Sequence, residues 1–123
     1  MKLQNSLYTI VEESHSDEGF EYQIGLNADC EIYKAHFPGL PITPGVCIIQ
    51  IAQELYELSM KRTTALVAIK NVKFITVMIP EPGKRYTYRF RKIVDDGEFA
   101  KFQVVVSLDD TVCAKLSLVC RLR

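Results

Sequence analysis

The sequence contains no tryptophan and only two histidines, His15 and His36, and its four cysteines form no Cys-x-x-Cys pair. It therefore lacks the paired thiols of the common zinc and redox motifs. We expect neither a metal nor a redox cofactor. The cysteines are interpreted as reduced side chains, three of them inside apolar segments, and they are Cys30, Cys47, Cys113 and Cys120.

An excess of charge of one sign is missing as well, and so are long hydrophobic runs. Fifteen basic side chains balance fifteen acidic ones, so no overall field attracts the chain to nucleic acid or to an anionic membrane surface. No stretch approaches the roughly twenty apolar residues of a membrane span. Residues 1–14 also lack the apolar core of a signal peptide. These absences predict a cytoplasmic protein with no nucleic-acid or membrane partner.

The length and the first half of the sequence predict one domain that opens with a β-hairpin. With 123 residues, 48% of them hydrophobic, the chain suffices for one core and is too short for two typical domains. Residues 7–26 mix β-branched or aromatic residues with polar ones around the turn-forming segment SHSDEG, which is typical of two strands. Residues 27–43 lose this periodicity and gather proline and glycine, so we expect an ordered loop.

Residues 44–62 predict one long helix. Thr43 is expected to cap its start, and Pro44 suits the first helical position because its missing N–H is not needed there. The first half of this helix is apolar nearly all round, so a single flat contact does not bury it. The helix must therefore be wrapped on several sides or shared with a second subunit.

The remainder of the chain predicts four strands joined by turn-forming segments. Together they are expected to form an antiparallel meander, and they span residues 64–75, 85–94, 98–108 and 111–123. A hairpin, one buried helix and a run of antiparallel strands is an α+β pattern in which a sheet curls around the helix. We expect residues 1–123 to form this single domain.

Most of the candidate chemistry lies in the segment HFPGLPITPGV, residues 36–46. His36 precedes a rigid Phe-Pro-Gly turn that would fix the direction of its imidazole. Histidine is suited to moving protons near neutral pH, since its unperturbed pKa is about 6.5. His15, in contrast, lies in the first turn and is interpreted as a solvated residue.

The start of the predicted helix supplies a second element of the candidate site. Since Pro44 has no N–H, the first backbone donors are those of Gly45 and Val46, which have no acceptor inside the helix. Gly45 has no side chain, so a carbonyl oxygen can approach this positive helix end closely. A proton acceptor and a carbonyl-polarising helix end suit proton abstraction next to a thioester carbonyl.

Residues 36–53, HFPGLPITPGVCIIQIAQ, resemble the HFPG-x-P-x-x-PGV segment of the beta-hydroxyacyl-acyl carrier protein dehydratases. The resemblance implies a hotdog fold and dehydration of 3-hydroxyacyl thioesters to 2-enoyl thioesters in fatty acid or related lipid synthesis. It also implies a homodimer or an assembly of dimers, with active sites across the interface, acting on thioesters of acyl carrier protein or coenzyme A. By position, His36 matches the catalytic histidine, Gly45 the carbonyl-polarising glycine and Gln50 the place of the catalytic carboxylate. Substrate-binding positions are expected at Phe37, Gly39, Pro44, Val46 and Glu54.

Gln50 departs from the family pattern, because an amide cannot exchange a proton at neutral pH. In the account we favour, His36 is the sole acid–base group and Gln50 orients the departing hydroxyl, with Glu54 helping through water. Alternatively, the chain is a non-catalytic partner that binds acyl groups, or it is a thioesterase built on the same fold.

Basic residues of the later half are candidates for contact with an acidic carrier protein, although such charges are more often a solvated face. They are Lys70, Lys73, Arg85, Arg89 and Arg91.

Overall fold

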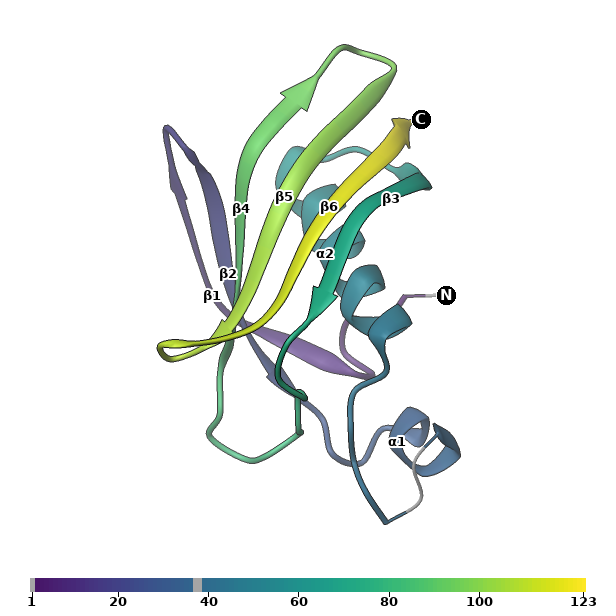
Figure 1. The fold of residues 1–123 in the computed structure, drawn as a ribbon, viewed down its shortest axis with the longest axis vertical. Coiled ribbons are helices and arrows are strands. Elements are labelled where there is room, and N and C mark those ends of the chain that lie inside the picture. Colours follow the sequence, from purple (N-terminus) through teal and green to yellow (C-terminus); the bar gives the residue numbers. More distant parts are fainter. Residues whose placement is uncertain (1, 37–38) are drawn as a thin grey trace.

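The computed structural model describes residues 2–36 and 39–123, apart from the side chain of His36. Its strands are β1 (Tyr8–Ser16), β2 (Gly19–Leu26), β3 (Thr64–Phe74), β4 (Tyr86–Asp95), β5 (Phe99–Leu108) and β6 (Thr111–Leu122), and its helices are α1 (Glu31–His36) and α2 (Gly45–Met60). The six strands form one antiparallel sheet that curls around α2 (Figure 1). The predicted α+β architecture is therefore confirmed.

The order of the strands corrects the expected meander. The sheet runs β1-β2-β4-β5-β6-β3, so β3 pairs with β6 at the edge of the sheet rather than with β4. The connections explain this order. The turns at residues 96–98 and 109–110 are too short for anything but a hairpin, and Gly97 and Asp109 take positive φ there. Residues 75–85 form a longer connection, which allows the chain to leave β3 and to pair β4 with β2 instead.

The curled sheet covers most of the apolar surface of α2. The buried apolar residues of this helix are Cys47, Ile48, Ile49, Ile51, Ala52, Leu55 and Tyr56. Tyr56 stacks on Phe102 of β5 with ring centroids 4.3 Å apart and planes 4° from parallel, a contact worth roughly 0.5–1.5 kcal/mol beyond its buried area. Val46, in contrast, is 71% exposed. The helix is thus wrapped on several sides within one chain, which is one of the two arrangements that the sequence predicts.

The segment between the hairpin and α2 contains a helix that the sequence pattern does not predict. Six residues of this segment form α1, which lies beyond the N-terminal end of α2 (Figure 1). An Asn27 side chain accepts the backbone N–H of Asp29 at 3.1 Å before the helix begins, and Tyr33 inserts into the core. A helix of six residues is too short to show apolar periodicity in the sequence. It depends on the burial of Tyr33 in the core.

Within the described ranges, no helix has both the length and the apolar character needed to cross a membrane. The four cysteines are free thiols, as expected, and all but the half-buried Cys30 lie in the core.

Candidate active site

Helix α2 begins without a side-chain cap. Its N-cap residue is Pro44, in an extended conformation, and the first helical bonds run from the N–H groups of Cys47 and Ile48 to the Pro44 carbonyl, at 3.0 and 3.1 Å. By helix geometry the N–H groups of Gly45 and Val46 precede the first bonded turn. The positive end of α2 therefore carries backbone donors and no side-chain oxygen, as a carbonyl-polarising site requires.

The expectation that Thr43 caps α2 is wrong. Its Oγ1 instead donates to the Met78 carbonyl at 2.9 Å, and it also lies 2.9 Å from the Tyr33 hydroxyl. The backbone N–H of Thr43 bonds the same carbonyl at 2.9 Å. The connection after β3 thus takes up the hydroxyl that would otherwise occupy the helix start, and this long-range contact leaves no local signal in the sequence.

An apolar cavity of about 300 Å³ adjoins this helix start. It is lined by Ile42, Thr43, Pro44, Gly45, Ile48, Phe74, Ile75, Thr76, Val77 and Met78. The Phe74 ring lies so close to Gly45 that an added Cβ would come within 2.8 Å of two ring atoms. Sequence reasoning places Pro44 and Gly45 at the site, and it misses Phe74 because β3 meets α2 only in the folded chain.

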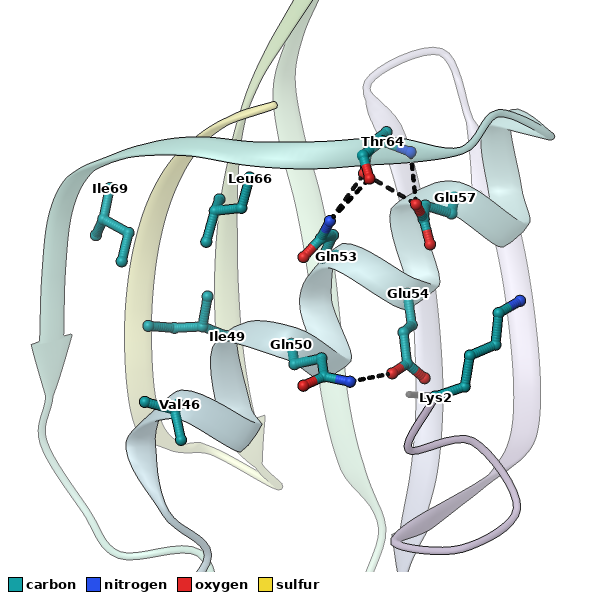
Figure 2. Close-up of a pocket in the computed structure, with 10 residues that line it drawn as sticks. All are labelled: Lys2, Val46, Ile49, Gln50, Gln53, Glu54, Glu57, Thr64, Leu66 and Ile69. Atoms are coloured by element: carbon teal, nitrogen blue, oxygen red, sulfur yellow. Dashed lines mark hydrogen bonds between the residues drawn. The ribbon is translucent and has the colours of Figure 1, made fainter. Parts of the chain in front are cut away.

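A second cavity of about 490 Å³ lies between α2 and β3 (Figure 2). One part of its wall is apolar and the other is polar, and its lining residues are Lys2, Val46, Ile49, Gln50, Gln53, Glu54, Glu57, Thr64, Leu66 and Ile69. The predicted residues Val46, Gln50 and Glu54 are thus brought to one cavity. Both cavities are flanked by the N-terminal half of α2 and by β3 or the residues after it.

The Glu54 carboxylate is the centre of the polar wall and is almost buried, with 8% of the residue exposed. Its Oε2 accepts the backbone N–H of Leu3 at 2.7 Å and the Nε2 of Gln50 at 2.9 Å. Its Oε1 accepts the backbone N–H of Gln4 and the Tyr8 hydroxyl, each at 3.0 Å. Burial, and after it the Glu54 charge, raises the pKa of Tyr8, so this phenol stays protonated and donates.

Two further polar residues of the wall attach α2 to β3. Gln53 donates to the carbonyl and the hydroxyl of Thr64, at 3.3 and 3.1 Å. The Glu57 carboxylate accepts the N–H of Thr64 at 2.6 Å and its hydroxyl at 3.0 Å. Their bonds are directed at the strand rather than at Gln50, which gives them a structural role (Figure 2).

The remaining predicted residues are His36, Phe37 and Gly39. His36 is the last residue of α1, and its side chain and the whole of Phe37 lie outside the described residues. Gly39 follows at a positive φ of 78°, a conformation that favours glycine. The predicted roles of these three residues in catalysis and substrate binding stay predictions.

The family follows from comparison with known proteins. The model of the ApeI-like family, described as ApeI dehydratase, matches residues 12–117. This chain belongs to the ApeI-like dehydratase family. A 3-hydroxyacyl-[acyl-carrier-protein] dehydratase FabZ from Saccharophagus degradans is 30% identical over 100 residues, which cover 73% of this chain and 68% of that protein. The FabZ of Campylobacter hominis is 34% identical over 96 residues, covering 72% and 66%. The matches thus span about two thirds of the length of these relatives.

Solved structures share the fold of this family member. The dehydratase heterocomplex ApeI:P from Xenorhabdus doucetiae superposes with a TM-score of 0.74 at 17% identity, covering 92% of this chain and 96% of that one. Thioesterase superfamily member 2 from Mus musculus gives 0.65 at 12% identity, covering 94% and 82%. The hotdog fold is confirmed, and so are the family and its dehydratase activity. Dehydration of 3-hydroxyacyl thioesters in lipid synthesis is the reaction that the family and its relatives support.

The buried tyrosines predict loss of stability in alkaline solution. Burial raises the pKa of Tyr33, beside Thr43, and of Tyr56 in the core, in each case to about 12, whereas tyrosine in an unfolded chain has a pKa of about 10. Below pH of about 10 both states are neutral. Between about 10 and 12 the unfolded chain loses its protons first, so the free energy of unfolding falls as pH rises, by at most about 1.4 kcal/mol per pH unit for each tyrosine.

Urea denaturation at a series of pH values measures this fall, with tyrosinate absorbance as a second readout. Tyr33→Phe should make the fall less steep, because one of the buried tyrosines with a raised pKa no longer titrates. An equally steep fall in the free energy of unfolding of that variant would contradict the raised pKa of Tyr33.

Proposed function

We propose that this chain removes water from a 3-hydroxyacyl group carried as a thioester on acyl carrier protein, with His36 moving the proton. The observation that carries the proposal is the uncapped start of α2, where Gly45 adjoins an apolar cavity. Such a helix end stabilises the charge that develops on a thioester oxygen during proton abstraction. One donor of this kind contributes about 10²–10³ in kcat.

The proposed reaction balances without a cofactor. The thioester oxygen binds at the N–H groups that begin α2, which acidifies the proton on the neighbouring carbon. His36 takes this proton, the electron pair forms the carbon–carbon double bond, and the 3-hydroxyl group leaves. The imidazolium returns the same proton to the departing oxygen, so the products are a 2-enoyl thioester, water and neutral His36.

Gln50 has an orienting role in this mechanism. Its amide exchanges no proton at neutral pH, but its carbonyl oxygen can accept a hydrogen bond from the substrate hydroxyl. The Nε2 of Gln50 is directed at Glu54, which agrees with an accepting rather than a donating role toward substrate. Catalysis then depends on a single titrating group, His36.

Acyl carrier protein is proposed as the carrier from the names of the relatives and from local charge. The curated relatives are dehydratases of acyl-carrier-protein substrates. Arg89 and Arg91 both contact Glu21, at 2.6 and 3.5 Å, and are therefore partly neutralised. Of the five candidate cations, Lys70, Lys73 and Arg85 are the exposed ones that remain to meet an acidic carrier. The reaction is assigned to the cytoplasm, in keeping with the free thiols of the chain.

A homodimer is proposed from the edge of the sheet. Strand β3 has one neighbour, β6, so its other side is an edge in the single chain. Val67, Ile69 and Phe74 of this strand are 48%, 49% and 51% exposed. An apolar edge strand is a template for pairing with a second strand. The curled sheet covers most of the apolar surface of α2 and leaves Val46, Leu58 and Met60 exposed, so the dimer is inferred from β3 rather than from the helix.

The first test of the mechanism is His36→Ala, with His15→Ala as the matched control. We expect His36→Ala to lower dehydration of 3-hydroxyacyl thioesters at least about a hundredfold, because it removes the one general base. His15 lies near the end of β1 rather than in the turn, with an exposed side chain paired to Glu13, so its removal should leave the rate unchanged. Product analysis separates enoyl thioester from free acid, and release of free acid by the unmodified protein would support a thioesterase instead.

Gln50→Glu tests the departure from the family pattern with almost no change in volume. The new carboxyl would lie beside Glu54, and two carboxylates at this distance share a proton. A protonated group beside the substrate hydroxyl can act as an acid, so we expect dehydration to increase about tenfold. The pH–rate profile should also change from one ionisation to two.

Gln53→Glu is the control for Gln50→Glu, because it adds the same charge to the same cavity one helical turn away. It should produce neither the increase nor the second ionisation. A fall in rate for Gln50→Glu would show that the amide oxygen itself is required. An unchanged rate would remove Gln50 from the site.

Self-association should be visible by light scattering at micromolar concentration, where we expect twice the mass of one chain. Val67→Lys and Ile69→Lys together should shift the protein toward monomer, because they place charge on the exposed edge. Replacing the exposed Val94 of β4 by lysine is the control. A monomeric wild-type protein would contradict the homodimer and would leave a different hotdog chain as the partner.

A further inference from the structure

Among the described residues, four groups bond the Glu54 carboxylate, and all four are donors. They are the backbone N–H groups of Leu3 and Gln4, the Tyr8 hydroxyl and the Gln50 amide. A carboxylate offers about four lone-pair sites, so these partners fill its capacity. Direct contact between Glu54 and a water or a substrate hydroxyl would displace one of them.

The same four partners surround the Glu54 carboxylate with donors. A carboxyl that donates its own hydrogen needs an acceptor, and the two backbone N–H groups cannot accept. Hydrogen bonds to an ionised acceptor are roughly twice as strong as neutral ones, which compensates the burial of this charge. Glu54 is thus a fixed acceptor rather than a proton donor.

This fixed acceptor determines the orientation of the Gln50 amide. The two ends of a glutamine amide are nearly equal in shape, so shape alone does not select one orientation. Turning the amide over would place its oxygen 2.9 Å from Glu54 Oε2, where Nε2 now lies, and two acceptors at that distance repel each other. Figure 2 shows the Nε2 facing Glu54 and the carbonyl oxygen on the opposite side of the amide.

We infer that Glu54 is a positioning residue, which holds the Gln50 amide so that its carbonyl oxygen accepts the 3-hydroxyl of the substrate. The inference rests on the proposed dehydration. An O–H that donates to this oxygen keeps its lone pairs directed elsewhere, where the proton from His36 can reach them. Glu54 acts only through Gln50.

Residues near the start of the sequence also hold the Glu54 carboxylate in place. Leu3 and Gln4 bond Glu54 across 51 and 50 residues of sequence, and Leu3 is buried in the core. Two of the four donors therefore come from backbone N–H groups, whose positions depend on residues 3–8 packing against α2. Sequence alone shows no link between this segment and the motif that begins at His36.

The test compares Glu54→Gln with Glu57→Gln in the full chain. Both substitutions replace a carboxylate on the same face of α2 that accepts a backbone N–H, but only Glu54 contacts Gln50. Two kinetic quantities are measured: kcat for a 3-hydroxyacyl N-acetylcysteamine thioester, and the inhibition constant of the saturated thioester of equal length, which lacks the hydroxyl.

We expect Glu54→Gln to lower kcat about tenfold or more, with the inhibition constant unchanged within about twofold, because only the hydroxyl depends on Gln50. Glu57→Gln should leave both close to the wild-type values. Parallel losses of kcat and inhibitor binding in Glu54→Gln would make Glu54 merely structural, and an unchanged kcat would also overturn the inference.

A second measurement does not depend on turnover or on the stability of Glu54→Gln. The side-chain NH₂ resonances of Gln50 are assigned by their loss in Gln50→Leu. In the wild-type protein we expect them to be well separated and slow to exchange with solvent, unlike those of the exposed Gln103. Averaged, rapidly exchanging signals would overturn the inference. Absence of dehydration by the wild-type protein, with protected Gln50 signals, would instead refute the proposed function.

Discussion

The rest of the structure depends on the burial of α2 within one curled sheet. This burial covers most of the apolar surface of the helix and, apart from the last turn with the exposed Leu58 and Met60, leaves one stripe uncovered. The stripe is Val46, Gln50, Gln53 and Glu57, spaced four, three and four residues apart, and it lines the larger cavity. Because residues at this spacing share one helix face, the position of the candidate site is a consequence of how the core is formed.

Placing the polar residue Glu54 on a helix that is buried in this way removes its carboxylate from water, which is unfavourable unless donors replace the water. An unpaired carboxylate in this position would be strongly destabilising, whereas four donors make it tolerable. Two of those donors are backbone groups of Leu3 and Gln4. Fold and chemistry are therefore coupled at this residue, because the contact that closes the N-terminal segment onto α2 also sets the direction of the Gln50 amide.

The same fold occurs in proteins named for different activities. A dehydratase heterocomplex and a thioesterase superfamily member both superpose on this chain over more than nine tenths of its length. The fold alone does not separate these activities. What separates them here is the match of residues 12–117 to a dehydratase family.

The sequence by itself determined the strands, the long helix and the family. Apolar periodicity, turn residues and the segment from His36 to Val46 act over a few neighbouring residues, so they can be recognised without coordinates. The tertiary structure alone decided that β3 lies at the sheet edge, that Thr43 bonds Met78 instead of capping α2, and that the Phe74 ring lies beside Gly45. It also decided which donors meet Glu54. Apart from the Gln50–Glu54 bond within α2, these contacts join residues that are 29 to 58 positions apart. The physical reason is that such pairs depend on the order of the strands around α2, which no local pattern encodes.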